Sequence, residues 1–504
     1  YFDTKLYTGN GSTQTISGLN FSSDLVWIKR RDGSGQDHVL QDSVRGFTGT
    51  TKLSSSSTSQ ENAGSGTVTS PEYGYISAAS STGFDITAST SGDQVNKNTW
   101  SYAAWAWDAG SSNTTIAAGD LNSSVYNQSQ TWSSGMKTTT TANASYSTTG
   151  RTTTFPDSLV ATAPFDADLT NFLYSQTGGP TTWFYVEFGT ALTNVTSIVF
   201  STEYSCPNGV IKLNGTDVAV DKSGLESGYV EVTVTGTIPT SLTEIAVQGN
   251  IGSARLKYLK IDGKILLDYG VTPPNVPSIP STVRANPSAG FSIVKGNFSF
   301  VGDGTLAHGL NAAPVFYVIK NIDTSSNWYA YTTAVDGTLD FGYLNTTGAF
   351  AASSRDLPTS SVIQYSSTAT GDHLVYCFAP VEGYSAMGSY TGNGSADGPF
   401  VYTGFRPRWI MTKSSTNGGT GWDWHVYDTA RDTYNAASKF LDPNASQREQ
   451  VRSDDANYTT MYFDILSNGF KLRNSFSSPN QSGATFIYAA FAEHPFASNG
   501  GLAR

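Results

Sequence analysis

Gly18-Leu-Asn-Phe-Ser-Ser-Asp-Leu-Val-Trp-Ile-Lys29 is a glycine-led turn followed by an apolar strand that ends in lysine. The pattern returns as Gly309-Leu-Asn-Ala-Ala-Pro-Val-Phe-Tyr-Val-Ile-Lys320 and, two residues shorter, as Gly404-Phe-Arg-Pro-Arg-Trp-Ile-Met-Thr-Lys413. Self-similarity of this kind marks a structural unit that occurs several times in one chain. We therefore expect three copies of one module.

Shorter motifs accompany each copy. Tyr-Thr-Gly-Asn-Gly-Ser occurs at 7–12 and 390–395, with the variant Phe-Val-Gly-Asp-Gly-Thr at 300–305. Asp42-Ser-Val-Arg45 matches Asp428-Thr-Ala-Arg431, whereas the middle copy has only Thr333-Ala-Val-Asp336. Each copy closes on an aromatic strand: Tyr102-Ala-Ala-Trp-Ala-Trp107, Val375-Tyr-Cys-Phe-Ala-Pro380 and Tyr488-Ala-Ala-Phe-Ala-Glu493.

These motifs give a map of four domains. The copies span 1–109, 287–381 and 384–497, and a module without the motifs fills 119–272. Within that module, Asp262-Gly263 lies between apolar residues and predicts a hairpin turn. The linker at 271–286 is rich in proline and should be extended.

Composition indicates the fold class. Aromatic residues make up 12% of the 504 residues and charged residues only 14%, so the surface consists mainly of Ser, Thr, Asn and Gly. Short apolar runs between Gly, Asn and Ser turns are typical of β-sandwiches. We expect an all-β chain of tandem β-sandwich, jelly-roll-type domains, with the apolar opening and closing strands of each copy paired centrally.

Charge and cysteine content argue against several classes. The net charge is −11 and no basic run occurs, which argues against nucleic-acid binding. No apolar run approaches the length of a membrane span. Cys206 and Cys377 fall in different modules, so both are expected to be free thiols. Because the sequence starts with Tyr1, we expect the natural N-terminus to be missing or processed.

The repeated motifs together resemble a domain of structural proteins of tailed phages, especially marine and cyanobacterial ones. The resemblance is strongest over 384–497, and it implies concanavalin-type, laminin-G-like jelly rolls. The module at 119–272 resembles a galactose-binding, discoidin-type jelly roll through Phe165-Asp-Ala-Asp168 and Trp183-Phe-Tyr-Val-Glu-Phe-Gly189. Its usual Asp-Gly turn is Asp-Ala here, and the usual leucine of the strand is Phe188. Neither family has a shared catalytic motif.

Candidate ligand sites are few. Asp166 and Asp168 lie in an acidic turn that could hold Ca²⁺, although such aspartates more often cap a turn. Trp422 and Trp424 flank Asp423 in a glycine-rich stretch and could stack on a ligand, or they could be core residues. Trp27, Trp105 and Trp409 lie in apolar strands and are expected in the core.

The remaining motifs indicate structure rather than catalysis. The Asp-x-x-Arg pairs could bind a sugar, but a charge-assisted hydrogen bond that fixes a turn is favoured. His38 and His425 each precede one of these pairs. No zinc-type histidine pair, nucleophile elbow or Walker loop is present, so we expect no enzyme and no required cofactor.

The leading hypothesis is a non-enzymatic virion surface or tail-fibre protein, extracellular and adhesive toward host-surface glycans or neighbouring virion proteins. A secreted cellular adhesin or surface-filament subunit is the alternative, and a polysaccharide-degrading tailspike is a further one. Neither nucleic acid nor membrane is an expected partner. By analogy with virion fibres, a homotrimer is expected.

Overall fold

The computed structural model describes most of the chain and confirms the all-β class. The described residues are 1–89, 94–118, 132–139, 151–152, 163–165, 173–174, 181–203, 211–226, 229–250, 255–266, 268, 276–450, 462–475 and 477–493. Helical structure in this part consists of single turns, among them η1 (Pro71–Tyr73) and α1 (Ser477–Asn480). None of its helices is long and apolar enough to cross a bilayer.

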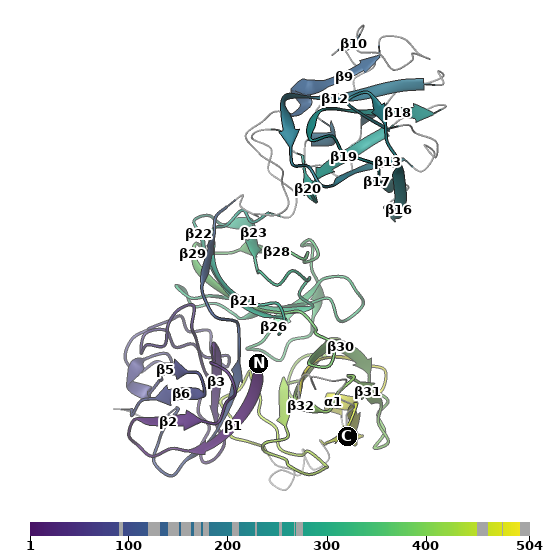
Figure 1. The fold of residues 1–504 in the computed structure, drawn as a ribbon. Helices are drawn as coiled ribbons and strands as arrows, with labels where there is room; N and C mark the ends of the chain where they lie inside the picture. Colours follow the sequence, from purple (N-terminus) through teal and green to yellow (C-terminus); the bar gives the residue numbers. More distant parts are fainter. Residues whose placement is uncertain are drawn as a thin grey trace. The chain divides into compact units, whose positions relative to one another are not determined.

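The chain forms two compact units (Figure 1). One consists of Gly119–Val276 and is called the inserted module below. The other joins Tyr1–Ala118 to Pro277–Arg504 and contains all three repeats, called repeat 1 (1–109), repeat 2 (287–381) and repeat 3 (384–497). The three repeats therefore make one compact unit, which we call the ring unit.

Each repeat contains a large antiparallel sheet with the same strand order. In repeat 1 the order is β1 (Phe2–Thr8), β7 (Ser101–Trp107), β3 (Leu25–Arg30) and β4 (Val39–Asp42). In repeat 3 it is β30 (Ser385–Thr391), β36 (Thr485–Ala492), β32 (Pro407–Ser414) and β33 (His425–Asp428). Repeat 2 has β22 (Phe291–Phe298), β29 (Gly371–Phe378), β24 (Phe316–Asn321) and β25 (Tyr329–Thr332) in these places. The expected central pairing is confirmed for the apolar strand that ends in lysine and the closing strand, which pair as β3 with β7, β24 with β29 and β32 with β36.

Repeat 2 extends its large sheet at both ends. The added strands are β26 (Asp340–Tyr343), β27 (Ala351–Ala352), β21 (Ser281–Asn286) and β8 (Thr114–Ile116). A small sheet covers one face of each large sheet. These small sheets are β2 (Gln14–Ser17), β6 (Gly83–Ile86) and β5 (Ile76–Ser80) in repeat 1, β23 (Gly302–Ala307) and β28 (Val362–Ser367) in repeat 2, and β31 (Phe400–Tyr402), β35 (Gly469–Leu472) and β34 (Phe463–Leu466) in repeat 3.

The large sheets are buried on both faces. In β3, Val26 and Ile28 point into the sandwich of repeat 1, while Leu25 and Trp27 point away from it into a second core. That second core takes one face of the large sheet from every repeat, so the three repeats share it. Burial on both faces explains why these strands are continuous apolar runs and do not alternate with polar residues. Trp27, Trp105 and Trp409 all lie in this shared core, as predicted.

The inserted module is a separate two-sheet sandwich with its own core. One sheet has the order β10 (Arg151–Thr152), β9 (Met136–Thr139), β12 (Thr181–Thr193), β18 (Ser241–Asn250), β14 (Ile211–Leu213) and β15 (Thr216–Asp217). The other has β11 (Leu173–Tyr174), β19 (Arg255–Ile261), β13 (Ile198–Glu203), β17 (Tyr229–Val234) and β16 (Val220–Glu226), with β20 (Lys264–Ile265) beside β19. β19 and β20 form the predicted hairpin around Asp262-Gly263, both of which have positive φ.

Candidate functional site

The lysine that ends each repeated strand lies at a boundary between repeats. Lys29, Lys320 and Lys413 are at most 1% exposed. Lys29 donates to Ser446 O of repeat 3 at 2.8 Å, Lys320 to Thr58 O of repeat 1 at 3.0 Å, and Lys413 to Thr347 O of repeat 2 at 3.3 Å. The contacts run from repeat 1 to 3, from 3 to 2 and from 2 to 1. They close a head-to-tail ring inside one chain, which is the geometry of a cyclic oligomer.

Burial changes the acidity of these lysines. It lowers the pKa of Lys29 and Lys320 to about 7 and that of Lys413 to about 8. Each ammonium group is held by backbone carbonyls of two repeats, and a buried polar group without such partners would be costly. The three lysines therefore donate hydrogen bonds that connect neighbouring repeats. We call Lys29, Lys320 and Lys413 the ring lysines.

A second set of contacts follows the same ring. The residue directly before the fourth strand of each large sheet is His38, Trp328 or Trp424. Trp328 Nε1 donates to Ser54 O at 2.8 Å and Trp424 Nε1 to Tyr343 O at 3.0 Å, while His38 Nε2 lies 2.9 Å from Asp442 O. The residue of repeat 3 that is equivalent to His38 is thus Trp424. His425 lies one residue after this position, so the two histidines are not equivalent.

The backbone repeats the pattern a third time. Glu61 N donates to Ile322 O, Glu449 N to Arg31 O and Phe350 N to Ser415 O, at 3.0, 3.0 and 2.8 Å. Each acceptor lies two residues after the ring lysine of its own repeat. Three independent sets of contacts therefore relate the repeats in the same cyclic order.

The Asp-x-x-Arg motif also belongs to these boundaries. Asp42 and Arg45 form a 2.6 Å ion pair, and so do Asp428 and Arg431, with all four side chains at most 1% exposed. The Oδ1 atom of each aspartate accepts backbone N–H groups of its own turn, which confirms the predicted turn. The Oδ2 atom accepts a donor from the next repeat: Tyr376 Oη at 2.9 Å for Asp42, and Trp105 Nε1 at 3.1 Å for Asp428.

The third boundary lacks this pair. The register places Thr332 of repeat 2 where the other repeats have the aspartate, one residue before the match expected from the sequence. It also places Ala489 of repeat 3 where Trp105 and Tyr376 stand. The boundary between repeats 2 and 3 therefore lacks both the aspartate acceptor and the aromatic donor. The closing strand of repeat 1 is consequently shifted by two residues from its sequence match with the other copies, a shift that keeps the same face inward.

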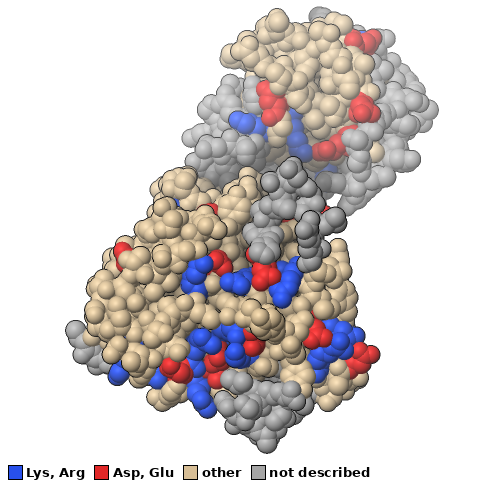
Figure 2. Space-filling model, turned by 60° about the horizontal axis from the view of Figure 1, so that its bottom comes forward, with Lys and Arg blue, Asp and Glu red and all other residues tan. Residues whose placement is uncertain are grey.

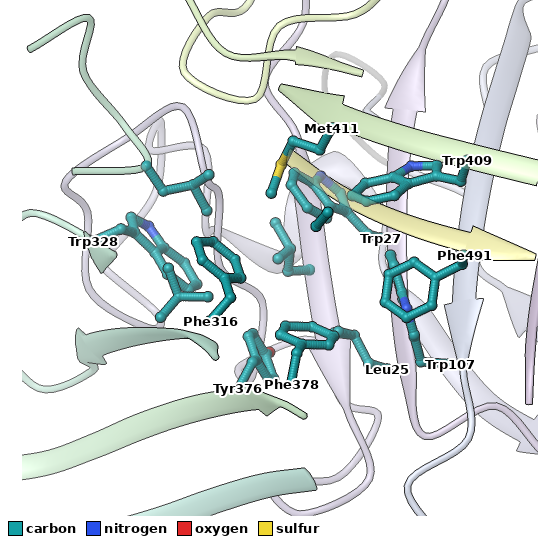
Figure 3. Close-up of a pocket in the computed structure, with 14 residues that line it drawn as sticks. Leu25, Trp27, Trp107, Phe316, Trp328, Tyr376, Phe378, Trp409, Met411 and Phe491 are labelled. Atoms are coloured by element: carbon teal, nitrogen blue, oxygen red, sulfur yellow. The ribbon is translucent and has the colours of Figure 1, made fainter. Parts of the chain in front are cut away.

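An apolar cavity of about 30 Å³ lies in the shared core (Figure 3). Figure 3 shows side chains of all three repeats converging on it, among them Trp107, Phe378 and Phe491. Ala489 is part of its lining. An apolar cavity of this kind stays dry. The space is explained by the methyl side chain of Ala489 at a position that holds a large ring in the other repeats.

The glycine-rich hexapeptide has a structural role as well. Asn96 Oδ1 accepts from Asn10 N, and Asn480 Oδ1 accepts from Asn393 N, so an asparagine from a distant loop holds each copy. A Cβ atom on Gly9 would lie 2.2 Å from Lys97 O, so only glycine fits there.

The predicted ligand residues have mixed positions. Trp424 is 1% exposed and packs against Phe316 and Phe350, which places it in the shared core and not on a ligand-binding surface. Trp422 is partly buried and packs beside Phe486. Asp166 and Asp168 lie outside the described residues. Among the residues that are described, no group of three His, Cys, Asp or Glu side chains could hold a metal ion.

Sequence reasoning missed one constellation of chemical interest. His425 Nδ1 lies 2.8 Å from Asp442 Oδ1, and its Nε2 lies 3.2 Å from Ser478 Oγ. This is the order of contacts in a Ser-His-Asp triad. The residues come from three distant segments, so no local motif could reveal them. Ser478 is 2% exposed, however, and a substrate carbonyl must come within about 3 Å of the nucleophile. The closed arrangement satisfies the buried histidine and offers no substrate access.

The inserted module carries a more open hollow of about 430 Å³, lined by Trp132, Ser134, Gly135, Lys137, Glu187, Phe188 and Gly189. Lys137 and Arg151 both form ion pairs with Glu187 at 2.5 Å. Trp132 is only 3% exposed, so its indole contributes little accessible surface to this hollow.

Comparison with known protein families gives a match over most of the chain. The family model described as "Domain of unknown function (DUF7483)" matches residues 1–221 and 271–495. Neither the curated proteins nor the solved structures contain a match. The two matched segments include repeats 1 and 2, repeat 3 as far as residue 495, and more than half of the chain. The chain therefore belongs to the DUF7483 family, a family of unknown function.

Proposed function

We propose that this chain is a non-enzymatic structural protein of the surface of a tailed-phage particle, adhesive toward host-surface glycans or neighbouring virion proteins. The proposal rests on the place of the repeated motifs in the structure. The ring lysines and the Asp-x-x-Arg pairs are buried at boundaries between repeats. The most regular part of the sequence thus builds the boundaries between repeats, and the outward faces and loops are left for contacts.

The ring also supports a role in a particle. One chain provides three head-to-tail repeats around a common core, the arrangement that a homotrimeric fibre obtains from three chains. The homotrimer expected by analogy would combine three such chains, each with its own ring of three repeats. It remains a prediction. Most of the ring-unit surface visible in Figure 2 carries neither acidic nor basic side chains, which suits contacts made through hydroxyl, amide and aromatic groups.

The test is localisation on purified particles. Phage particles that carry the gene should contain the chain by mass spectrometry, and antibodies against the purified full chain should label their surface in electron micrographs. Fab fragments of these antibodies should reduce adsorption to host cells, whereas Fab fragments against an internal protein should not. A chain absent from particles but present on cell surfaces would replace the proposal by the cellular adhesin.

A further inference from the structure

The small sheets of the three repeats differ on their outward faces. In repeat 1, β2 turns Thr15 and Ser17 outward. The corresponding residues of β31 in repeat 3 are Phe400 and Tyr402, which are 45% and 66% exposed. Thr15 and Ser17 show that the scaffold needs only small polar residues at these two positions. Burial in the core therefore does not account for the two aromatic rings.

Repeat 2 differs at the edge of the corresponding strand. Ile279 N donates to Thr305 O of β23 at 3.0 Å, and the Ile279 side chain is 2% exposed and belongs to the sandwich core of this repeat. The direct comparison is therefore between repeats 1 and 3, of which one presents small polar residues and the other exposed rings.

Both rings of repeat 3 lie on glycine. A Cβ on Gly469 would be 3.0 Å from the Phe400 ring, and a Cβ on Gly404 would be 3.7 Å from Tyr402 Oη. The rings are therefore backed by main chain. Residues i and i+2 of a strand lie on one face about 6–7 Å apart. We call Phe400 and Tyr402, with Gly404 and Gly469 behind them, the aromatic platform.

The charges beside the platform are paired. Lys471 contacts Asp397 at 2.8 Å, and Arg473 contacts Asp464 at 2.6 Å. The four charges cancel, so the platform has no net charge. Asp397 is 80% exposed on its side chain and would repel an acidic ligand. The electrostatics fit an uncharged partner that also accepts and donates hydrogen bonds.

The area of the platform limits the size of its partner. Two partly exposed aromatic side chains offer on the order of 200 Å² of apolar surface. A stable protein interface buries about 800 Å² on each side. The platform is therefore too small for a second copy of the chain, but it matches one or two sugar rings, whose C–H faces stack on aromatic rings.

We propose that the aromatic platform of repeat 3 binds an uncharged polysaccharide by stacking of pyranose rings on Phe400 and Tyr402. This inference rests on the proposed adhesive function and assigns a place and a ligand class to it. Tyr402 Oη and the ion pairs of Lys471 and Arg473 supply hydrogen bonds to the sugar hydroxyl groups at the edge of the stack.

The test is affinity electrophoresis of the full chain in gels that contain dextran, amylose, mannan or galactan, with alginate as the acidic comparison. At least one neutral polysaccharide should retard the chain, and alginate should not. The double variant Phe400→Thr, Tyr402→Ser, which carries the residues of repeat 1, should bind at least tenfold more weakly with an unchanged thermal midpoint. Tyr434→Ser, which removes an 85% exposed tyrosine elsewhere in repeat 3, should bind normally.

Several outcomes would overturn this inference. These are no retardation by any neutral polysaccharide, retardation by alginate alone, and equal loss in the Tyr434 variant. A dimer in sedimentation that the double variant dissociates would show that the platform binds a second copy instead. The assay needs no particle, so its result is separate from localisation: a negative gel with labelled particles removes the platform and keeps the virion proposal.

Discussion

The hydroxyl of Tyr376 in repeat 2 donates a 2.9 Å hydrogen bond to the buried carboxylate of Asp42 in repeat 1. Two residues 334 positions apart in sequence thus join two repeats. Replacing Tyr376 by Phe removes this donor from a charged acceptor, and such bonds contribute about 1.5–3 kcal/mol. We expect a loss of this size in the free energy of unfolding, measured in denaturant. Tyr434→Phe, at an exposed position, should change it by less than about 0.5 kcal/mol. Equal effects of the two variants would contradict the role of the bond.

The cavity beside Ala489 predicts a stabilising substitution. Ala489→Val adds apolar atoms next to a void of about 30 Å³ and should raise the free energy of unfolding by about 1 kcal/mol. Ala490 lies on the opposite, filled face of the same strand, so Ala490→Val should cost about 1–3 kcal/mol through overpacking. Thermal unfolding of both variants makes the comparison. A destabilised Ala489 variant would mean that the cavity cannot accept the added methyl groups.

His38 predicts a pH dependence. Trp27 Nε1 can only donate, so His38 Nδ1 accepts its 2.8 Å bond and the proton resides on Nε2, which donates to Asp442 O. A second proton would face the indole N–H, and burial lowers the pKa of His38 well below 6.5. The unfolded chain takes up this proton first, so stability present above pH 6.5 is lost as pH falls further, by up to about 1.4 kcal/mol per pH unit.

Burial lowers the pKa of His308 to about 4, so this residue adds a second loss of the same sign. Unfolding free energies between pH 7.5 and 5 should therefore decrease. His38→Gln keeps an acceptor and a donor without titrating, and its slope below pH 6.5 should be shallower than that of the natural chain. Parallel slopes would refute the assignment to His38.

The reactivity of Ser478 tests whether the Ser478-His425-Asp442 constellation is catalytic. Because its hydroxyl is buried against His425, a fluorophosphonate probe should not label the folded chain, and p-nitrophenyl acetate should be hydrolysed no faster than in the presence of the Ser478→Ala variant. If the probe labels the natural chain but not the Ser478→Ala variant, the Ser478 hydroxyl is accessible to substrates. An esterase activity would then replace the non-enzymatic proposal.

The repeats, their strands and the Asp-x-x-Arg turns could be predicted because glycine-led turns, apolar runs and short local motifs are encoded in adjacent residues. The shared core could not. The run Leu25-Val-Trp-Ile28 indicates burial on two faces, but a sequence pattern does not say what covers the second face. The partners of Asp42 and Asp428 come from other repeats, at distances along the chain that no motif records.

Tryptophan positions illustrate the same limit. Trp27 lies in an apolar strand, and its burial was predictable from that strand. Trp424 lies in a glycine-rich, polar stretch that is typical of an exposed loop, yet its indole fits between Phe316 and Phe350 of the neighbouring repeat. The platform of Phe400 and Tyr402 was likewise hidden, because exposed and buried aromatic residues look alike until the register is known.

Closure of the ring within one polypeptide has a consequence in dilute solution. Subunits of a homotrimer separate when the protein concentration falls below the dissociation constant, because association depends on mass action. Here the covalent chain keeps the effective concentration of each repeat high for its neighbours, whatever the concentration of the protein. The contact from Lys29 to Ser446 O, between the first and the last repeat, therefore persists at any degree of dilution.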